Sequence, residues 1–247
     1  MTEHRILGNR RAPLPNVAAL ATLVDRCLNR GPRMPGMGTF YGPSGFGKTE
    51  AAIYSANRYQ AVYVQMGASW TKKKLCTAIL DEIGRTPAKT IADMIEQIGE
   101  YLAINQVPLL IDEADFLLKR GMIEDAREIY EISKSPVILI GEEEMPAKLE
   151  MIERVHGRML DWVGAVPGTI EDVAMLAEIY AEGVIIASDL QEKLLDQSHG
   201  SIRRICINLT RFHEHAMVHG LAEVDVQAWG QKEFYTGIAP KTRRNMR

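Results

Sequence analysis

The chain has 247 residues, of which 46% are hydrophobic and 25% are charged, and its formal net charge is −3. These values are typical of one large globular domain with or without a small addition, and they exclude a disordered tail, a collagen-like rod and a wholly basic nucleic-acid coat protein. The charge is uneven: residues 1–90 carry 13 basic and 5 acidic side chains, whereas residues 91–161 carry 7 and 16. This asymmetry predicts a basic face that can bind a polyanion, and an acidic region that has a different function.

The cysteines and the apolar runs indicate the compartment. Cys27, Cys76 and Cys206 are far apart and odd in number, which predicts a reduced protein without disulfides. The N-terminal sequence MTEHRILGNRR lacks the apolar core of a signal peptide, and no apolar run is long enough to span a bilayer. We therefore expect a cytoplasmic protein, in a bacterium or a phage-infected host, with no membrane partner.

Short apolar runs alternate with helical patterns along the first two thirds of the chain. After a first amphipathic helix over residues 17–29, we predict strands over 39–41, 61–66, 109–112 and 137–140, and helices over 48–59, 72–83, 90–105 and 122–134. The apolar runs are short and bounded by Gly, Pro or polar residues, as in strands covered on both faces. The predicted fold class is therefore α/β, with a parallel sheet and helices on both of its faces.

The pattern changes after a possible last strand over residues 162–166, because Pro167 and Gly168 interrupt it. The residues beyond are predicted to be helical, over 170–181, 189–198, 201–219 and 225–230. We predict an N-terminal segment over 1–38, an α/β nucleotide-binding domain over 39–167, a small all-α lid domain over 168–236 and a basic tail over 237–247.

A phosphate-binding loop follows the first predicted strand and opens a predicted helix. Its sequence is Gly42-Pro43-Ser44-Gly45-Phe46-Gly47-Lys48-Thr49, which matches G-x-x-x-x-G-K-[ST]. The glycines let the backbone N–H groups face a polyphosphate, and the helix N-terminus adds its positive dipole end. Lys48 would reach the β- and γ-phosphates, and the Thr49 hydroxyl would bind Mg²⁺.

A second motif supports the first. The apolar run Leu109-Leu110-Ile111 ends in Asp112-Glu113, about 60 residues after the loop. Asp112 would hold Mg²⁺ through its water shell, and Glu113 would orient the attacking water. We interpret Asp115 mainly as the N-cap of the next helix. The two motifs together predict a nucleoside triphosphatase that uses ATP and Mg²⁺.

With its Asp-Glu motif and its C-terminal helical lid, the chain resembles the AAA+ class. It is most similar to the ATPases that select DNA targets for transposition, such as the phage Mu B protein and the partner ATPases of insertion-sequence transposases. The resemblance spans residues 39–209, in the stretches FYGPSGFGKTEAA, PLLIDEADFL, AREIYEISKSPVILIGEEEMP, ERVHGRMLDWV and HGSIRRICINL.

The resemblance implies roles for further residues of the site. Glu142 occupies the position of the γ-phosphate sensor, where many relatives carry Asn or Thr; the alternative is a solvated acidic loop. Arg154 and Arg158, four apart on one expected helical face, include the arginine finger for a neighbouring subunit's ATP, and the match favours Arg158. The alternative is a surface salt bridge with Glu150 or Glu153. Arg203 fits the lid arginine that reaches back to the γ-phosphate, or is simply an exposed helix arginine.

The resemblance also implies contacts to duplex DNA from the ATPase body. The best candidates are Thr71, Lys72, Lys73 and Lys74 at a helix start, where positive charge opposes the helix dipole unless an anion is present. Lys119 and Arg120 follow the Asp-Glu strand and are weaker candidates. Such contacts would go to phosphates, so binding is expected to depend on salt and little on sequence. The alternative is a solvated basic run.

These features predict an ATP-dependent regulator of transposition that assembles on duplex DNA as a filament or ring, selects the target and activates a transposase. Hydrolysis would dismantle the assembly. An alternative is a helicase loader or replication initiator, which shares the same ATPase and predicts single-stranded DNA and a helicase partner. A nucleotide-gated scaffold that hydrolyses poorly is a third possibility, against which the intact Lys48, Asp112 and Glu113 argue.

Overall fold

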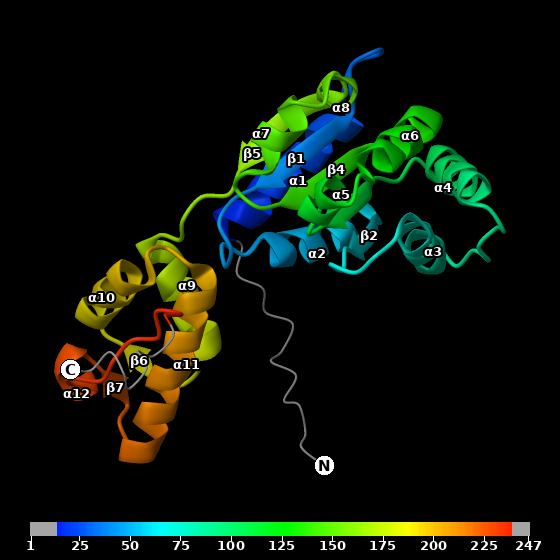
Figure 1. Cartoon of the computed structure of the whole chain (residues 1–247). Helices are drawn as coiled ribbons and strands as arrows, with labels where there is room; N and C mark the ends of the chain where they lie inside the picture. Colours follow the sequence, from blue (N-terminus) through cyan, green and yellow to red (C-terminus); the bar gives the residue numbers. More distant parts are fainter. Residues whose placement is uncertain (1–13, 239–247) are drawn as a thin grey trace, which may run out of the picture. The chain divides into compact units, whose positions relative to one another are not determined.

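The computed structural model describes residues 14–238 and divides into two compact units (Figure 1). The α/β unit is Pro15–Val166, and the helical unit takes in the residues from Pro167 onward. Residues 1–13 and most of the basic tail predicted over 237–247 lie outside the described residues.

A parallel five-stranded sheet forms the centre of the α/β unit. Its strands are β1 (Met37–Tyr41), β2 (Val62–Gln65), β3 (Leu109–Asp112), β4 (Val137–Gly141) and β5 (Met159–Gly164), in the order β2-β3-β4-β1-β5. Its helices are α1 (Pro15–Leu28), α2 (Lys48–Tyr59), α3 (Lys72–Glu82), α4 (Ile91–Asn105), α5 (Asp115–Lys119), α6 (Ile123–Ser133), α7 (Met145–Glu150) and α8 (Glu153–His156). The predicted α/β fold class is confirmed.

Helices cover both faces of this sheet, which explains why its strands are largely apolar. Successive side chains of a strand point to opposite faces. Leu109 and Ile111 of β3 pack in one buried cluster with α3, α4 and α6, whereas Leu110 packs in another with α1 and α2. Figure 1 shows α3, α4 and α6 together on one side of the sheet. All of β4 is buried.

The last strand of the sheet differs from its prediction. The prediction placed it over residues 162–166, but β5 begins at Met159 and ends at Gly164. Its early residues pair with β1, starting with Met159 beside Met37. Asp161 interrupts the apolar sequence there, and its carboxylate pairs with Arg26 of α1 at 2.5 Å. The apolar pattern did not reveal the start of β5, because Asp161 is polar and its partner Arg26 lies far away in the sequence.

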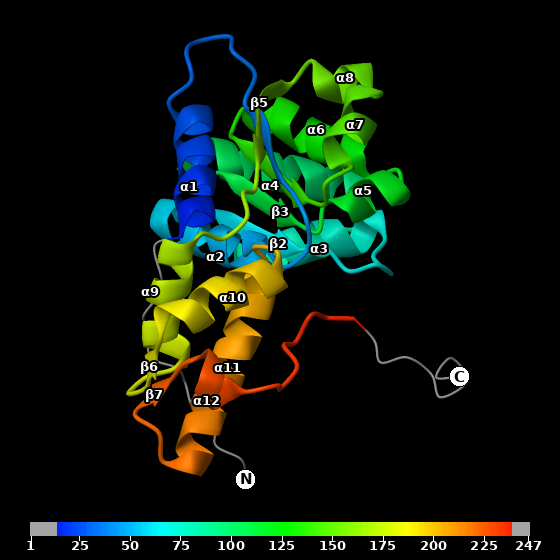
Figure 2. The same cartoon turned by 90° about the vertical axis from the view of Figure 1, so that its left-hand side faces the viewer.

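The helical unit consists of α9 (Ile170–Tyr180), α10 (Ser188–Ser198), α11 (Ile202–His219) and α12 (Val226–Trp229), with two short strands, β6 (Ile185–Ile186) and β7 (Glu223–Val224) (Figure 2). The strands pair in parallel and correct the expectation of a purely helical segment. They are too short to give a period-2 pattern. The apolar face of α11 is buried as predicted, with Phe212 packed edge-on against Trp229 at 4.6 Å between ring centroids.

Among residues 14–238, no helix is both long enough and apolar enough to cross a membrane.

Candidate active site

The predicted nucleotide-binding residues follow strands that lie next to each other in the sheet. The phosphate loop begins at Gly42 after β1, Asp112 ends β3, and Glu142 follows β4, which lies between those two strands. Ligands of open parallel sheets bind at the carboxyl ends of the strands, so these residues share the edge where a ligand is expected.

The phosphate loop has the backbone that its glycines allow. Gly45 and Gly47 have φ angles of 88° and 82°, in the left-handed region, and Gly47 is the N-cap of α2. The Lys48 ammonium donates to the carbonyl oxygens of Gly42 and Pro43, at 2.6 and 2.9 Å. Burial lowers the pKa of Lys48, and the surrounding carboxylates, Asp112 first, oppose that shift. The loop thus places a partly desolvated cation at the start of α2.

Two oxygen ligands converge where Mg²⁺ was predicted. The Thr49 hydroxyl donates to Asp112 Oδ2 at 2.8 Å, and Asp112 is only 2% exposed. Mg²⁺ is held in such sites by one or two protein oxygens together with phosphates and water. A hydroxyl and a carboxylate side by side at the phosphate loop fit that requirement, so Thr49 and Asp112 would hold the ion.

Glu113 is partly buried beside these groups. Burial raises its pKa, and the negative charge of Asp112 raises it further, while Lys48 opposes the shift. Its φ of 55° is the left-handed conformation, which costs a residue other than glycine about 1 kcal/mol. Local strain of this kind concentrates at functional sites. Glu113 therefore has the setting of a general base, with a carboxylate that accepts a proton more readily than one in water.

The structure gives Asp115 a different role from the predicted N-cap. Helix α5 starts at Asp115 itself, and the capping residue is Ala114. The Asp115 carboxylate, which is 3% exposed, instead accepts the backbone N–H of Glu142 at 2.6 Å. A β-carbon on Gly141 would lie 2.4 Å from Asp115 Oδ2, so this contact requires glycine before Glu142. Asp115 thereby fixes the backbone of the exposed Glu142 loop, while the predicted sensing role of the Glu142 side chain stays a prediction.

Two residues that the sequence did not indicate also hold this site. Tyr63 on β2 donates its hydroxyl to Asp112 Oδ2 at 3.2 Å. Asn16 on α1 donates to the carbonyls of Phe46 and Val166, at 2.9 and 2.8 Å, and accepts the N–H of Val166. A tyrosine in a strand and an asparagine in a first helical turn are ordinary residues in sequence, so no local signal could have found them.

The two arginines of ERVHGR do not share a helical face. Arg154 lies on α8, but that helix ends at His156, and Arg158 follows it directly before β5. The predicted i, i+4 arrangement is therefore wrong, because Gly157 caps the helix. The Arg158 guanidinium is bonded to the carboxylate of Glu131 on α6, not to a glutamate near it in sequence.

Arg158 lines a cavity of about 630 Å³ in which four of the five charged side chains are cationic. We call this cavity the basic hollow; its charged residues are Arg30, Arg33, Glu131, Lys134 and Arg158. The Arg158 carbonyl accepts the N–H of Met37, the first residue of β1. The basic hollow therefore lies at the amino ends of the strands, at the sheet edge opposite the phosphate loop.

Arg203, the predicted lid arginine, is exposed on the first turn of α11 in the helical unit. Ser201 caps that helix by accepting the N–H of Arg204. The role of Arg203 at the γ-phosphate stays a prediction.

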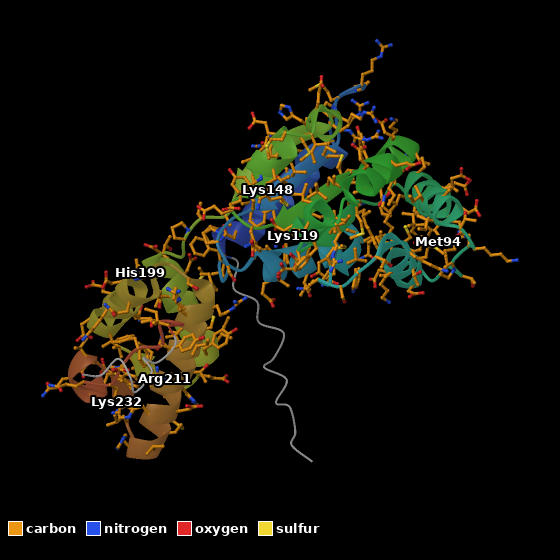
Figure 3. All side chains as sticks on the ribbon, viewed as in Figure 1. Met94, Lys119, Lys148, His199, Arg211 and Lys232 are labelled. Atoms are coloured by element: carbon orange, nitrogen blue, oxygen red, sulfur yellow. The ribbon has the colours of Figure 1, made fainter. Side chains whose placement is uncertain are left out.

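The predicted DNA-binding residues form two neighbouring groups in the α/β unit. Thr71 caps α3 by accepting the N–H of Lys74, so its hydroxyl oxygen serves the helix. Lys72, Lys73 and Lys74 follow on the exposed first turn. Lys119 ends α5, where Figure 3 labels it, and Arg120 donates to the carbonyl of Ala68 at 2.7 Å. Because Ala68 belongs to the loop before α3, Arg120 lies against the lysine-bearing element.

Residues 33–149 match the family of sequences described as AAA domain. No curated protein matches the chain in sequence. The α/β unit thus contains an AAA-type domain, and the phosphate loop and the Asp112-Glu113 motif both lie within it.

Solved structures resemble the chain at low sequence identity. The ORC2 protein of Aeropyrum pernix, solved as ADPNP–ADP complexes, has a TM-score of 0.71 and 16% identity, over 92% of this chain and 70% of that one. The ORC1 protein of the same organism, solved in complex with DNA, has a TM-score of 0.62 and 20% identity, over 86% of this chain and 62% of that one. The RuvB Holliday junction branch migration motor of Thermotoga maritima has a TM-score of 0.57 and 21% identity, over 86% of this chain and 66% of that one. The chain therefore has the AAA+ P-loop fold.

Proposed function

We propose that the chain is a Mg²⁺-dependent ATPase that binds DNA in its ATP-bound state and assembles with copies of itself. The observation that carries this proposal is the convergence of four side chains at the carboxyl edge of the sheet. Lys48 and Thr49 open α2 after the phosphate loop, Asp112 ends β3, and Glu113 follows that strand directly. The match to the AAA domain, a family of nucleotide-hydrolysing ATPases, supports the same conclusion.

Each of these residues has a separate task in hydrolysis. The loop N–H groups and the Lys48 ammonium bind the phosphates, and Thr49 and Asp112 hold Mg²⁺, which would supply charge neutralisation on the phosphate oxygens. Glu113 orients the attacking water and accepts its proton, a task for which the raised pKa of its carboxylate is suited. Hydrolysis then removes the γ-phosphate on which assembly depends.

The surfaces at the two ends of the parallel strands suggest how copies of the chain assemble. The phosphate loop lies at the carboxyl edge, near Asp112, Glu113 and Glu142, and the cationic side chains of the basic hollow lie at the amino edge. Head-to-tail association brings two different, complementary surfaces together and produces a ring or a filament. Arg158 is then the finger that a neighbouring subunit inserts toward ATP, as the sequence resemblance implies. Arg154, on the exposed face of α8, is the second candidate.

DNA binding is proposed for the exposed first turn of α3 with Lys119 and Arg120. A single copy offers few cations there, so one subunit alone binds weakly. An ATP-bridged row of subunits adds these contacts and raises the apparent affinity. A solved relative by fold, ORC1, was crystallised in complex with DNA, which favours a DNA-directed role for this chain as well.

Two processes use an ATPase of this kind. The likeness to the ORC proteins and to CDC6P of Pyrobaculum aerophilum favours a replication initiator or helicase loader. Transposition target selection, with a transposase as partner, is the second candidate; it is favoured by the stretches ERVHGRMLDWV and HGSIRRICINL, which resemble that group. A replication initiator or helicase loader should prefer single-stranded DNA or bind a helicase. A transposition target selector should assemble on duplex DNA without sequence preference.

The test measures ATP hydrolysis and DNA binding together. Phosphate release by the purified chain should require Mg²⁺ and should disappear in Lys48→Ala. Binding to labelled duplex and single-stranded DNA should be tighter with a non-hydrolysable ATP analogue than with ADP, and electron microscopy of the same mixtures should show assemblies only with the analogue. Equal binding with both nucleotides would contradict the proposed coupling, and the preferred strand form separates the two processes.

A further inference from the structure

We propose that Lys72 positions the DNA-binding element through a buried carboxylate, and that Lys73 and Lys74 make the phosphate contacts. This inference rests on the proposed DNA binding and divides three consecutive lysines, which look equivalent in the sequence, into two roles. We call residues 67–74 the basic turn; it contains the loop after β2 and the first turn of α3.

The partner of Lys72 is Asp125 on α6. The Lys72 ammonium lies 2.9 Å from Asp125 Oδ1, and Asp125 is only 6% exposed. Its other oxygen, Oδ2, is buried and has no hydrogen-bond partner among the described residues. A buried carboxylate that loses its cation is left with an uncompensated charge, which strongly disfavours the folded state. Asp125 therefore holds the Lys72 ammonium. Moving that ammonium to a DNA phosphate would leave the buried carboxylate without a cation, which is unfavourable.

The same ion pair cancels the charge that Lys72 would offer to DNA. A phosphate approaching Lys72 also meets the negative charge of Asp125. Lys73 and Lys74 are exposed on the same turn. Lys74 Nζ lies 5.7 Å from the centroid of the Trp70 ring, a contact that leaves its charge intact. Among the three lysines of this turn, Lys73 and Lys74 are therefore the cations available to the DNA backbone.

A second contact anchors the other end of the basic turn. Arg120 donates to the Ala68 carbonyl at 2.7 Å. Trp70 packs closely over Gly67, because a β-carbon there would lie 2.5 Å from the indole nitrogen. The basic turn is held by Arg120 before the helix and by Lys72 within its first turn. A pre-ordered element loses less conformational entropy on binding, so the Lys72 contact should raise DNA affinity without adding a phosphate contact.

The experiment uses the salt dependence of duplex binding, which counts phosphate contacts. The full chain is titrated with labelled duplex DNA and a non-hydrolysable ATP analogue at several salt concentrations. Each lost phosphate contact lowers the slope of log affinity against log salt by about 0.9. The variants are Lys73→Ala, Lys74→Ala and the pair Lys72→Met with Asp125→Asn. The double variant removes one positive and one negative charge, so the net charge of the element is unchanged and no carboxylate is left unpaired. Lys89→Ala, in the exposed segment between α3 and α4, is the control lysine.

We expect Lys73→Ala and Lys74→Ala each to lower the slope by about 0.9. The double variant should keep the wild-type slope but bind roughly threefold to tenfold more weakly, since the turn is less ordered. Lys72→Arg, which keeps a cation beside Asp125, should bind duplex DNA with the wild-type affinity. Lys72→Met alone should lower the thermal midpoint by about 3–6 °C, because Asp125 is then buried without a partner.

Two outcomes overturn the inference while DNA binding stands. The first is a double variant whose slope falls as far as that of Lys73→Ala. The second is a double variant with wild-type slope and wild-type affinity. Failure of the proposed function gives a different result: the wild-type chain would bind duplex weakly, and the Lys73 and Lys74 variants would then bind no differently from Lys89→Ala.

Discussion

The phenol of Tyr63 on β2 donates a hydrogen bond of 3.2 Å to Asp112 Oδ2, at the end of the neighbouring strand β3. The same oxygen accepts the Thr49 hydroxyl at 2.8 Å, and Oδ1 accepts the N–H of Glu113 at 2.8 Å. Burial raises the pKa of Tyr63 above its ordinary value, and the charge of Asp112 adds to that shift. The phenol therefore remains a donor throughout the physiological pH range and holds the carboxylate proposed to bind Mg²⁺.

Tyr63→Phe should weaken Mg²⁺ binding by about tenfold, because residues that orient a metal ligand typically contribute that much to metal affinity. The measurement is the Mg²⁺ concentration that gives half-maximal binding of a fluorescent ATP analogue. Tyr59→Phe is the matched control, since that phenol on α2 donates to the Ala21 carbonyl, away from Asp112. Equal Mg²⁺ midpoints for the two variants would exclude the role of Tyr63.

Glu113→Gln should retain ATP binding but lower kcat by about 10²- to 10⁴-fold, since it removes the base and leaves the phosphate loop and the metal ligands intact. Lys48→Ala should lose affinity for ATP itself. Equilibrium binding and phosphate release separate the two effects. Glu50→Gln, an exposed carboxylate on the first turn of α2, should change neither. Wild-type turnover by Glu113→Gln would show that another group orients the water.

The pH profile should report the raised pKa of Glu113. Hydrolysis requires the carboxylate form, so kcat/KM should fall as the pH drops through that pKa. Because burial and Asp112 raise the pKa, the acidic limb should lie at a higher pH than the ordinary titration of a glutamate. The residual activity of Glu113→Gln should lack this limb. A wild-type limb at or below the ordinary glutamate range would contradict the assignment.

Arg158→Ala should lower kcat by at least about 100-fold, because an arginine finger contributes 10³- to 10⁵-fold in related ATPases and GTPases. A subunit that supplies the finger differs from the one that binds ATP. Mixing Arg158→Ala with Lys48→Ala protein should therefore restore part of the activity at mixed interfaces. Arg154→Ala tests the second candidate for the finger, which lies on α8. A fall in kcat in that variant and not in Arg158→Ala would assign the finger to Arg154. The absence of recovery at every ratio, with both variants folded and co-assembled, would count against a finger at Arg158.

Asn16→Ala should lower the free energy of unfolding by about 1–2 kcal/mol, since it leaves the Phe46 carbonyl and the Val166 backbone groups without their partner. ATP affinity should fall as well, because Phe46 belongs to the phosphate loop. Urea denaturation and nucleotide titration measure the two effects. Asn57→Ala is the control, because the side chain of this exposed residue donates to the Ile53 carbonyl of its own helix. A loss of stability in Asn16→Ala no larger than in Asn57→Ala would exclude this role.

The sequence predicted the α/β fold class because its signals are local. A strand covered on both faces is a short apolar run, and helices α2, α3, α4 and α6 lie within one residue of their predicted ends. The phosphate loop, too, is contained in eight consecutive residues, from Gly42 to Thr49, and its glycines are required by the backbone that they adopt. A motif of this kind carries its own geometry, so the nucleotide-binding residues can be predicted from the amino-acid sequence alone.

Tertiary structure decided which side chains share their charges and hydrogen bonds. Arg158 meets Glu131, Lys72 meets Asp125, and Asn16 meets Val166, which is 150 residues away. In the sequence the three lysines of α3 are alike; only the packing of α6 beside their turn gives one of them a buried carboxylate. Strand order has the same origin, because pairing of β1 with both β4 and β5 brings distant segments together through backbone hydrogen bonds that carry no side-chain signature.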